Sequence, residues 1–254
     1  MHDTWLVFRR ELSHRLRQPV WLIMGITQPV LYMFFFGPLL ESFVKHTPGF
    51  PPGNVWQIFA PALMVQMVII GSTFVGVNLL SEIRAGVFER FQISPASSIS
   101  ILFGKVLTVA FTVACQCLLI ILLCCLVYGL QPDLLGMSIS LLMVVVLSAS
   151  LASVSYSVAL RIQNEDSVSA LLNALLMPMF LLSGTLLPIT PKLAPEWLWR
   201  LSRVNPIAYV MDASRASFRG DFSFGSIYSG VMALTVVAVL SFGWGIITFS
   251  KEHP

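Results

Sequence analysis

The sequence predicts an all-α integral membrane protein with six transmembrane helices. Three observations carry this prediction. Of the 254 residues, 56% are hydrophobic and 11% are charged, whereas soluble domains carry about 25% charged residues. Apolar runs of about 20 residues, which is the length that crosses a hydrocarbon layer of ~30 Å, can be placed six times. Between the second and third runs lies a polar stretch that still keeps apolar residues at helical spacing.

The N-terminal segment, residues 1–19, is expected to form a helix that lies in the membrane interface. Trp5, Phe8, Leu12 and Leu16 share one helical face, and the arginines lie elsewhere. This pattern is typical of an interfacial helix whose basic side chains reach anionic headgroups. A disordered basic tail is the alternative. A cleavable signal peptide is excluded, because the following run is too long and no small-x-small cleavage site follows it.

The six spans are expected in order along the chain, with two longer polar segments between them. We place the spans at Val20–Leu40, Trp56–Leu80, Ile101–Tyr128, Leu134–Leu160, Val168–Leu187 and Ser226–Ser250. Segment 81–100 is expected to be cytoplasmic, and segment 188–225 is expected to be extracellular or re-entrant. No remaining stretch is long enough for a soluble domain, so residues 1–254 are expected to form a single transmembrane domain.

The distribution of Lys and Arg predicts the orientation in the membrane. The side that holds both termini carries Arg9, Arg10, Arg15, Arg17, Arg84, Arg90, Lys105, Arg161 and Lys251. The first outside loop has only Lys45, so the positive-inside rule places both termini in the cytoplasm. The expected location is the cell inner or plasma membrane. The last outside segment departs from the rule, with Lys192, Arg200, Arg203, Arg215 and Arg219.

Several kinds of chemistry are absent from the chain. The centres of the spans carry no ionisable residue, which argues against a proton-coupled carrier. No histidine or paired carboxylates lie within the spans, which disfavours an intramembrane protease. No phosphate-binding Gly-x-x-x-x-Gly-Lys-Ser/Thr loop is present, so the chain is not expected to hydrolyse a nucleotide. We expect no catalytic residue, no metal site and no nucleic-acid partner.

The four cysteines all lie in the third span. Their spacing fits neither a zinc site nor a disulfide framework. We expect them to be small apolar packing residues: Cys115, Cys117, Cys124 and Cys125.

Uncharged polar residues and prolines inside the spans are candidates for a transport pathway. Pro29, Pro61 and Pro178 free backbone carbonyls that neighbours or a cavity must satisfy. Gln28, Gln66 and Asn173 are expected to line such a cavity, with Asn78 and Gln116 as further polar positions. For the small residues of the fourth span, from Ser148 to Ser157, ordinary helix packing is the better explanation.

Two blocks of residues resemble the permease subunits of ABC-2-type ABC transporters. The first block is Glu82, Gly86, Glu89-Arg90, Ser94-Pro95 and Gly104-Lys105. The second runs from Pro178 through Ser183-Gly184 to Pro188, then Pro195-Glu196-Trp197-Leu198, Asn205-Pro206, Tyr209 and Asp212-Ala213-Ser214-Arg215. Ala194-Pro195 stands where the family commonly has Leu-Pro. The order and spacing match along essentially the whole chain.

The resemblance implies a permease that dimerises and binds two copies of an ABC ATPase subunit, which would hold ATP and Mg²⁺. Residues Arg84–Ser98 would then contain the coupling helix that docks into the ATPase. Candidate docking residues are Arg84, Phe88, Glu89, Arg90, Phe91, Ser94 and Pro95. Phe88 and Phe91 would be apolar anchors, Glu89 and Arg90 would supply polar complementarity, and Ser94-Pro95 would start a helix. A solvated loop is the alternative.

The second block implies short helices outside the membrane before the last span. Trp197 and Trp199 suit the bilayer interface. Lys192, Arg200 and Arg203 would contribute to an extracellular gate or headgroup contact. Pro178, Ser183 and Gly184 join Gln28, Gln66 and Asn173 as pathway and gate candidates.

The sequence therefore predicts a membrane subunit that exports an amphipathic or lipidic substrate, such as a drug, natural product or glycolipid, using ATP hydrolysed by a separate chain. The uncharged spans favour such a cargo. A membrane anchor or regulatory subunit without cargo is the alternative, and an intramembrane enzyme is a weaker one. Import is disfavoured, because nothing resembles the loop of binding-protein-dependent importers.

Overall fold

The structure is a computed structural model that describes residues 2–17, 19–46, 55–86, 97–191, 193–222 and 224–252. Over these residues the chain is helical, with turns between the helices and no strand. The helices are α1 (His2–Leu16), α2 (Pro19–His46), α3 (Val55–Thr73), α4 (Val75–Arg84), α6 (Ser98–Tyr128), α7 (Leu134–Ile162), α8 (Glu165–Leu182), α9 (Glu196–Ser202), α10 (Pro206–Phe218) and α11 (Phe224–Glu252). The predicted all-α class is confirmed.

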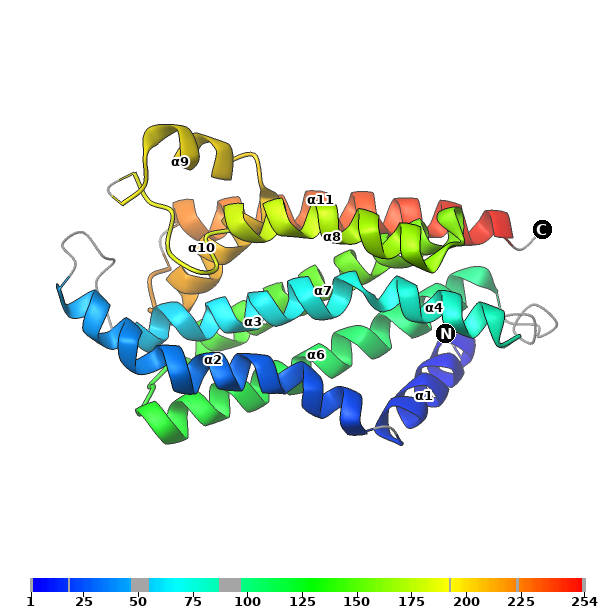
Figure 1. The fold of residues 1–254 in the computed structure, drawn as a ribbon, viewed down its shortest axis with the longest axis horizontal. Coiled ribbons are helices and arrows are strands. Elements are labelled where there is room, and N and C mark those ends of the chain that lie inside the picture. The colour runs from blue at the N-terminus through cyan, green and yellow to red at the C-terminus, as the bar shows by residue number, and fades with distance from the viewer. Residues whose placement is uncertain are drawn as a thin grey trace.

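The long helices run side by side as one bundle, and Figure 1 shows α1 set at an angle to them. The N- and C-termini lie at one end of the bundle, near the end of α4 (Figure 1). The short helices α9 and α10 lie at the opposite end (Figure 1). The described parts of the two polar segments between spans, 81–86 with 97–100 and 188–191 with 193–222, therefore belong to opposite ends of the bundle.

Five helical segments of the described chain are long and apolar enough to cross a membrane. They are Val55–Arg84, Ser98–Tyr128, Leu134–Ile162, Glu165–Leu182 and Ile227–Lys251. They match the second to sixth predicted spans. Helix α2 covers the first predicted span with 28 residues and contains Pro29 and Pro38; the count of six spans stays a prediction. The fifth span ends at Leu182, five residues earlier than predicted, because the chain turns there.

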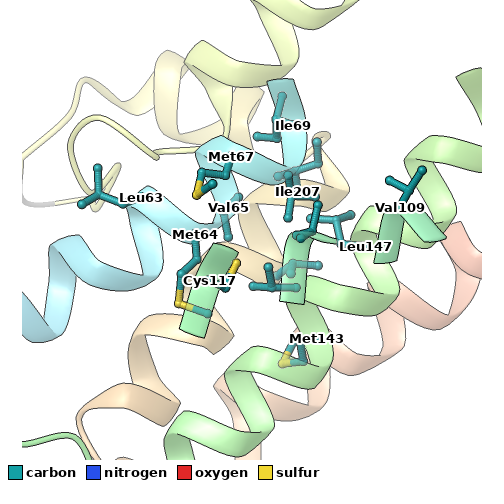
Figure 2. Packing of buried hydrophobic residues seen from close by; sticks show 14 of the residues in the cluster. Leu63, Met64, Val65, Met67, Ile69, Val109, Cys117, Met143, Leu147 and Ile207 are labelled. Atoms are coloured by element: carbon teal, nitrogen blue, oxygen red, sulfur yellow. The ribbon is translucent and has the colours of Figure 1, made fainter. Parts of the chain in front are cut away.

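Helix α3 forms the centre of the bundle. Almost every one of its side chains is buried, including Pro61 and Gln66. Figure 2 shows Met64, Val65 and Ile69 of α3 packed among side chains of other helices, among them Cys117 of α6 and Leu147 of α7. Lipid tails are as apolar as these side chains, so within a membrane the close van der Waals packing of α3 against its neighbours is what holds these helices together.

The second predicted span is broken at Phe74, where α3 ends and α4 begins. The hydroxyl of Ser155 on α7 accepts a hydrogen bond from the Gly76 N–H at 2.8 Å and donates to the Thr73 carbonyl. Gly76 packs so closely that an added Cβ would lie 2.2 Å from the Ser155 carbonyl oxygen. The serine stripe of α7 thus supplies partners for a helix break and permits close packing, as expected of small residues.

Helix α1 packs against α6 and keeps part of its apolar surface exposed. Val7 and Phe8 are buried, and Val7 sits against Gly104 of α6. Trp5 and Leu16 remain about 60% exposed, at 58% and 61%. The predicted apolar face is therefore divided between the bundle and the surroundings, an arrangement that suits an interfacial helix.

The four cysteines are free, and Cys115 is exposed. Cys117 and Cys124 are buried in the core, and the Cys124 thiol lies 3.5 Å from the Met33 sulfur. Among the described residues, no three His, Cys, Asp or Glu side chains are grouped so that they could hold a metal ion.

Candidate functional site

The predicted docking segment is described only at its two flanks. Phe88, Glu89, Arg90, Phe91, Ser94 and Pro95 all lie outside the described residues. Arg84, the first docking candidate, is the last residue of α4 and pairs with Glu165 at the start of α8, with 3.4 Å between Nη1 and Oε1. On the other flank, the Ser97 hydroxyl caps α6 by accepting a hydrogen bond from the Ser100 N–H at 3.2 Å.

Three helices meet at a buried ion cluster that includes residues of α4 and α6, the two helices that flank this segment in the sequence. The Lys105 ammonium of α6 lies 2.5 Å from Glu82 of α4 and 3.2 Å from Glu11 of α1. The Lys105 side chain is 2% exposed, whereas those of Glu82 and Glu11 are 32% and 15% exposed. We call these three residues the Lys105 triad. A buried ammonium is stable only with such partners, so the triad ties α1, α4 and α6 together.

A cavity of about 690 Å³ lies at the end of the bundle that holds α1 and α4. We call it the polar cavity. It is lined by charged and amide side chains as well as apolar ones, including Glu11, Arg15, Gln28, Gln66, Asn78, Glu82, Gln116 and Tyr156. Two members of the Lys105 triad, Glu11 and Glu82, therefore form part of its wall.

A second cavity, of about 450 Å³, is almost entirely apolar. We call it the apolar cavity. Its lining comes from α2, α3 and the turn after α8: Tyr32, Met33, Phe36, Gly37, Leu39, Trp56, Phe59, Ala62, Leu63, Gln66, Thr185, Leu186 and Leu187. Gln66 lines both cavities, so the two adjoin along α3.

The pathway candidates from the first and second predicted spans and those from the fifth have different surroundings. Gln28 and Gln66 line the polar cavity. Asn173 is exposed on α8, where its amide donates to the Ser169 carbonyl one turn earlier at 2.9 Å. Pro178 is exposed within the same helix. Neither Asn173 nor Pro178 lines either cavity.

Ser183 and Gly184 form the turn that ends α8. The Ser183 hydroxyl donates to the Phe180 carbonyl at 2.6 Å and contacts the Thr185 hydroxyl. Gly184 has a φ of 72°, a left-handed backbone that glycine adopts without a steric cost. Both residues are buried, and the turn carries Thr185 and Leu186 into the wall of the apolar cavity.

Arg215 of α10 holds this turn in place. It donates to the Gly184 carbonyl at 2.8 Å, to the Thr185 carbonyl at 3.4 Å and to the Ile58 carbonyl of α3 at 3.2 Å. Burial lowers the pKa of Arg215 to about 10, with Asp212 opposing the change and Arg219 adding to it. The guanidinium therefore stays charged at neutral pH, and the carbonyl oxygens compensate part of its desolvation.

The second family block forms one end of the bundle. The Asn205 side chain caps α10 through the Ile207 N–H at 3.0 Å and donates to the Met179 carbonyl of α8 at 2.6 Å. Arg203 pairs with Asp212 at 2.8 Å and lies over the rings of Trp199 and Tyr209, 5.7 and 5.4 Å from their centroids. Lys192 lies outside the described residues.

The structure gives Lys105 and Arg215 roles that the charge pattern of the sequence does not predict. That pattern predicts a cytoplasmic charge for Lys105 and a position in an outside segment for Arg215. Both are buried inside the bundle, at 3% exposure each. Their presence in the two family blocks was the available signal, because a charged residue inside a hydrophobic bundle persists only with specific partners.

The comparisons with known proteins fit this arrangement. The ABC-2 type transporter family matches residues 2–219. The chain belongs to this family of membrane transport permeases.

Named relatives are similar to most of the chain. A transport permease named ycf38 of Cyanophora paradoxa is 25% identical over 85% of this chain and 73% of its own length. The daunorubicin resistance ABC transporter permease protein DrrB1 of Streptomyces coeruleorubidus is 25% identical over 82% of this chain and 72% of its own length. The multidrug ABC transporter permease YbhR of Escherichia coli K12 is 21% identical over 70% of this chain and 48% of its own length.

Proposed function

We propose that this chain is the membrane-spanning subunit of an ABC exporter that moves an amphipathic or lipidic substrate, such as a drug, natural product or glycolipid, out of the cytoplasm. A separate ABC ATPase, in two copies, binds and hydrolyses ATP with Mg²⁺; this chain itself holds no nucleotide. Two copies of the permease span the inner or plasma membrane with both termini in the cytoplasm. The relatives named for daunorubicin resistance and multidrug transport support a drug-like cargo.

The observation that carries this proposal is the pair of adjoining cavities within a chain of this family. A polar cavity near α1 and α4 meets an apolar cavity at Gln66. A substrate with a polar end and an apolar body would find both environments along one axis of the bundle. Both cavity volumes fall within the range of about 300–1,000 Å³ that is typical of pockets for small ligands.

The Lys105 triad supports a route for energy from the ATPase. It fixes Glu82, two residues before the end of α4, to α1 and α6. Movement of the segment between α4 and α6 would then be passed to three helices as packed units. ATP binding shifts this equilibrium only by its differential affinity for the two conformations.

The test is co-purification with the ATPase. The double substitution Glu89→Lys with Phe91→Ala removes a proposed polar contact and an apolar anchor. It is expected to abolish co-purification and stimulated ATP turnover, while membrane insertion and the elution volume in detergent stay unchanged.

A matched control makes the same changes at the other end of the bundle. Glu196→Lys with Phe222→Ala alters an exposed glutamate, whose pair with Arg200 is solvent-exposed and worth little, and an exposed phenylalanine. This control should keep the ATPase. If Glu89→Lys with Phe91→Ala also keeps it with normal turnover, the docking assignment is wrong.

The alternative is a membrane anchor that holds an ATPase without carrying cargo. It agrees with the same docking segment but makes no use of the cavities. Deleting the chain with the ATPase retained separates the two: lost export of a compound supports the permease, and unchanged export of every compound tested supports the anchor.

A further inference from the structure

We propose that the polar cavity binds a single amphiphile with a zwitterionic headgroup, in which a phosphate and an ammonium lie a few atoms apart. Phosphatidylethanolamine is the simplest lipid with this chemistry. Binding requires only this chain; the role of the amphiphile as cargo rests on the proposed function.

The Lys105 triad offers negative charge to such a ligand. Its two carboxylates share one ammonium, which leaves one negative charge uncompensated within the triad. Lys105 contacts one oxygen of each carboxylate, while an ionised carboxylate has about four lone-pair positions. Glu11 and Glu82 line the polar cavity and Lys105 does not. The triad therefore contributes carboxylates with open acceptors to the cavity wall, and such acceptors suit an ammonium.

Arg15 offers positive charge in the same cavity. It follows Glu11 by one helical turn on α1, and both side chains line the cavity. Among the residues that the structure describes, Arg15 forms no ion pair and no hydrogen bond. A guanidinium presents a planar set of donors that matches two oxygens of a phosphate. This side chain is the natural partner for the anionic part of the headgroup.

The spacing of the two charges favours a zwitterion over a single ion. Side chains four residues apart lie on the same face of a helix, so Glu11 and Arg15 present opposite charges side by side on the wall of one cavity. An anion alone would meet the excess carboxylate, and a cation alone would meet Arg15. His14 also lines this cavity, next to Arg15.

The rest of the cavity wall suits the hydrocarbon part. Met67, Ile70, Val109 and Val113 line it beyond the charged end. Gln66 then marks the start of the apolar cavity, where a chain could continue between α2 and α3. If α1 lies in the membrane interface, Glu11 and Arg15 stand at the depth of the lipid headgroups.

The experiment measures lipid binding to the purified, delipidated full chain by native mass spectrometry. Three probes are titrated: phosphatidylethanolamine, phosphatidylglycerol, which has a phosphate and no amine, and a dialkyldimethylammonium, which has a quaternary ammonium and no phosphate. We expect one saturable site per chain, with phosphatidylethanolamine bound most tightly. Arg15→Gln is expected to weaken its binding by about 10-fold or more, since a hydrogen bond to a charged group is lost.

Arg17→Gln is the matched control. It removes an exposed arginine two residues further along the chain that does not line the cavity. It should change the affinity by less than about 2-fold, because exposed surface charges contribute little. Glu11→Gln gives the second arm: binding of phosphatidylethanolamine should weaken while that of phosphatidylglycerol does not. A thermal melting curve for each variant confirms folding.

Three results would overturn the proposal. One is the absence of a saturable site for phosphatidylethanolamine in the unmodified chain. Another is an equal effect of Arg15→Gln and Arg17→Gln. The third is phosphatidylglycerol binding as tightly as phosphatidylethanolamine, which would assign the cavity to a simple anion.

A last arm separates cargo from a resident membrane lipid. The complex with its ATPase is reconstituted in vesicles that contain fluorescent phosphatidylethanolamine. ATP-dependent movement of the probe between leaflets, lost in Arg15→Gln, supports cargo. Movement that is absent while the purified chain still binds the lipid overturns the cargo role and assigns the site to a resident lipid. Lipid binding is measured without the ATPase. The binding result can therefore be interpreted even if the proposed exporter function is wrong.

Discussion

At the scale of single residues, Lys105 is a buried charge that joins three helices of the bundle. It sits in a wholly buried position of α6 and owes its stability there to Glu11 and Glu82. Each glutamate alone is replaceable, because the other still pairs with the ammonium. The ammonium is not, because its loss leaves two carboxylates facing each other.

This asymmetry gives a rank order of mutational effects. Lys105→Met is expected to destabilise the protein by about 3 kcal/mol or more, since removing one partner of a buried pair leaves uncompensated charge. Glu82→Gln and Glu11→Gln should each have a smaller effect, of about 1 kcal/mol. Thermal melting in detergent measures the order. Equal melting temperatures for Lys105→Met and Glu82→Gln would contradict the triad as a structural joint.

At the scale of the elements, the break between α3 and α4 depends on close contact with α7. A continuous helix would satisfy its own backbone, but this one transfers two hydrogen bonds to the Ser155 hydroxyl. The transfer is possible because Gly76 lets the α4 backbone approach the α7 backbone. The break also redirects α4, and with it Glu82 and Arg84, toward the partners they contact on α6 and α8.

Gly76→Ala tests this contact. The added methyl group would lie 2.2 Å from the Ser155 carbonyl oxygen, so α4 must move away from α7. Overpacking of this kind costs about 1–3 kcal/mol. Gly71→Ala is the control, because nothing lies within 4 Å of an added Cβ in that position. It should be neutral or stabilising by about 0.5–1 kcal/mol. Thermal melting that ranks the two variants the other way round would rule out the contact.

At the scale of the whole molecule, hydrophobic patterning predicted the class and most span positions. The runs of apolar residues set where helices form, because a chain in lipid must satisfy its backbone internally. Patterning did not predict the break at Phe74 or the early end of the fifth span at Leu182. These depend on Ser155 and Arg215, which reach them from distant parts of the chain.

The same limit applies to the candidate site. Gln28 and Gln66 were predicted from polarity within apolar runs, and both line the polar cavity. Asn173 met the same criterion but lies exposed on α8, where its amide donates one hydrogen bond within its own helix. Composition could not separate these cases, because the direction of a side chain depends on how its helix is rotated in the bundle. The positions of Arg15 and of the Lys105 triad at the polar cavity were not predicted, because in the sequence these residues look like ordinary surface charges.

Helix α8 leads to the last prediction, which concerns the assembly. Its exposed surface carries Leu171, Leu175, Met177 and Leu181, with the polar side chain of Asn173 among them. An amide directed at lipid tails is costly even when one of its hydrogen bonds is made. A second copy of the chain would cover this surface and give the amide a further partner, which favours α8 as the interface of the proposed dimer.

Asn173→Cys in a Cys115→Ser background is therefore expected to cross-link into a dimer with a short bis-maleimide in native membranes. Cys115 is replaced because it is exposed. Leu122→Cys in the same background is the control, since it is 56% exposed on α6 and lies on a different helix. Denaturing gel electrophoresis separates the monomer from the cross-linked dimer. Cross-linking of Leu122→Cys but not of Asn173→Cys would move the interface away from α8, because a two-fold axis brings together only the residues close to it.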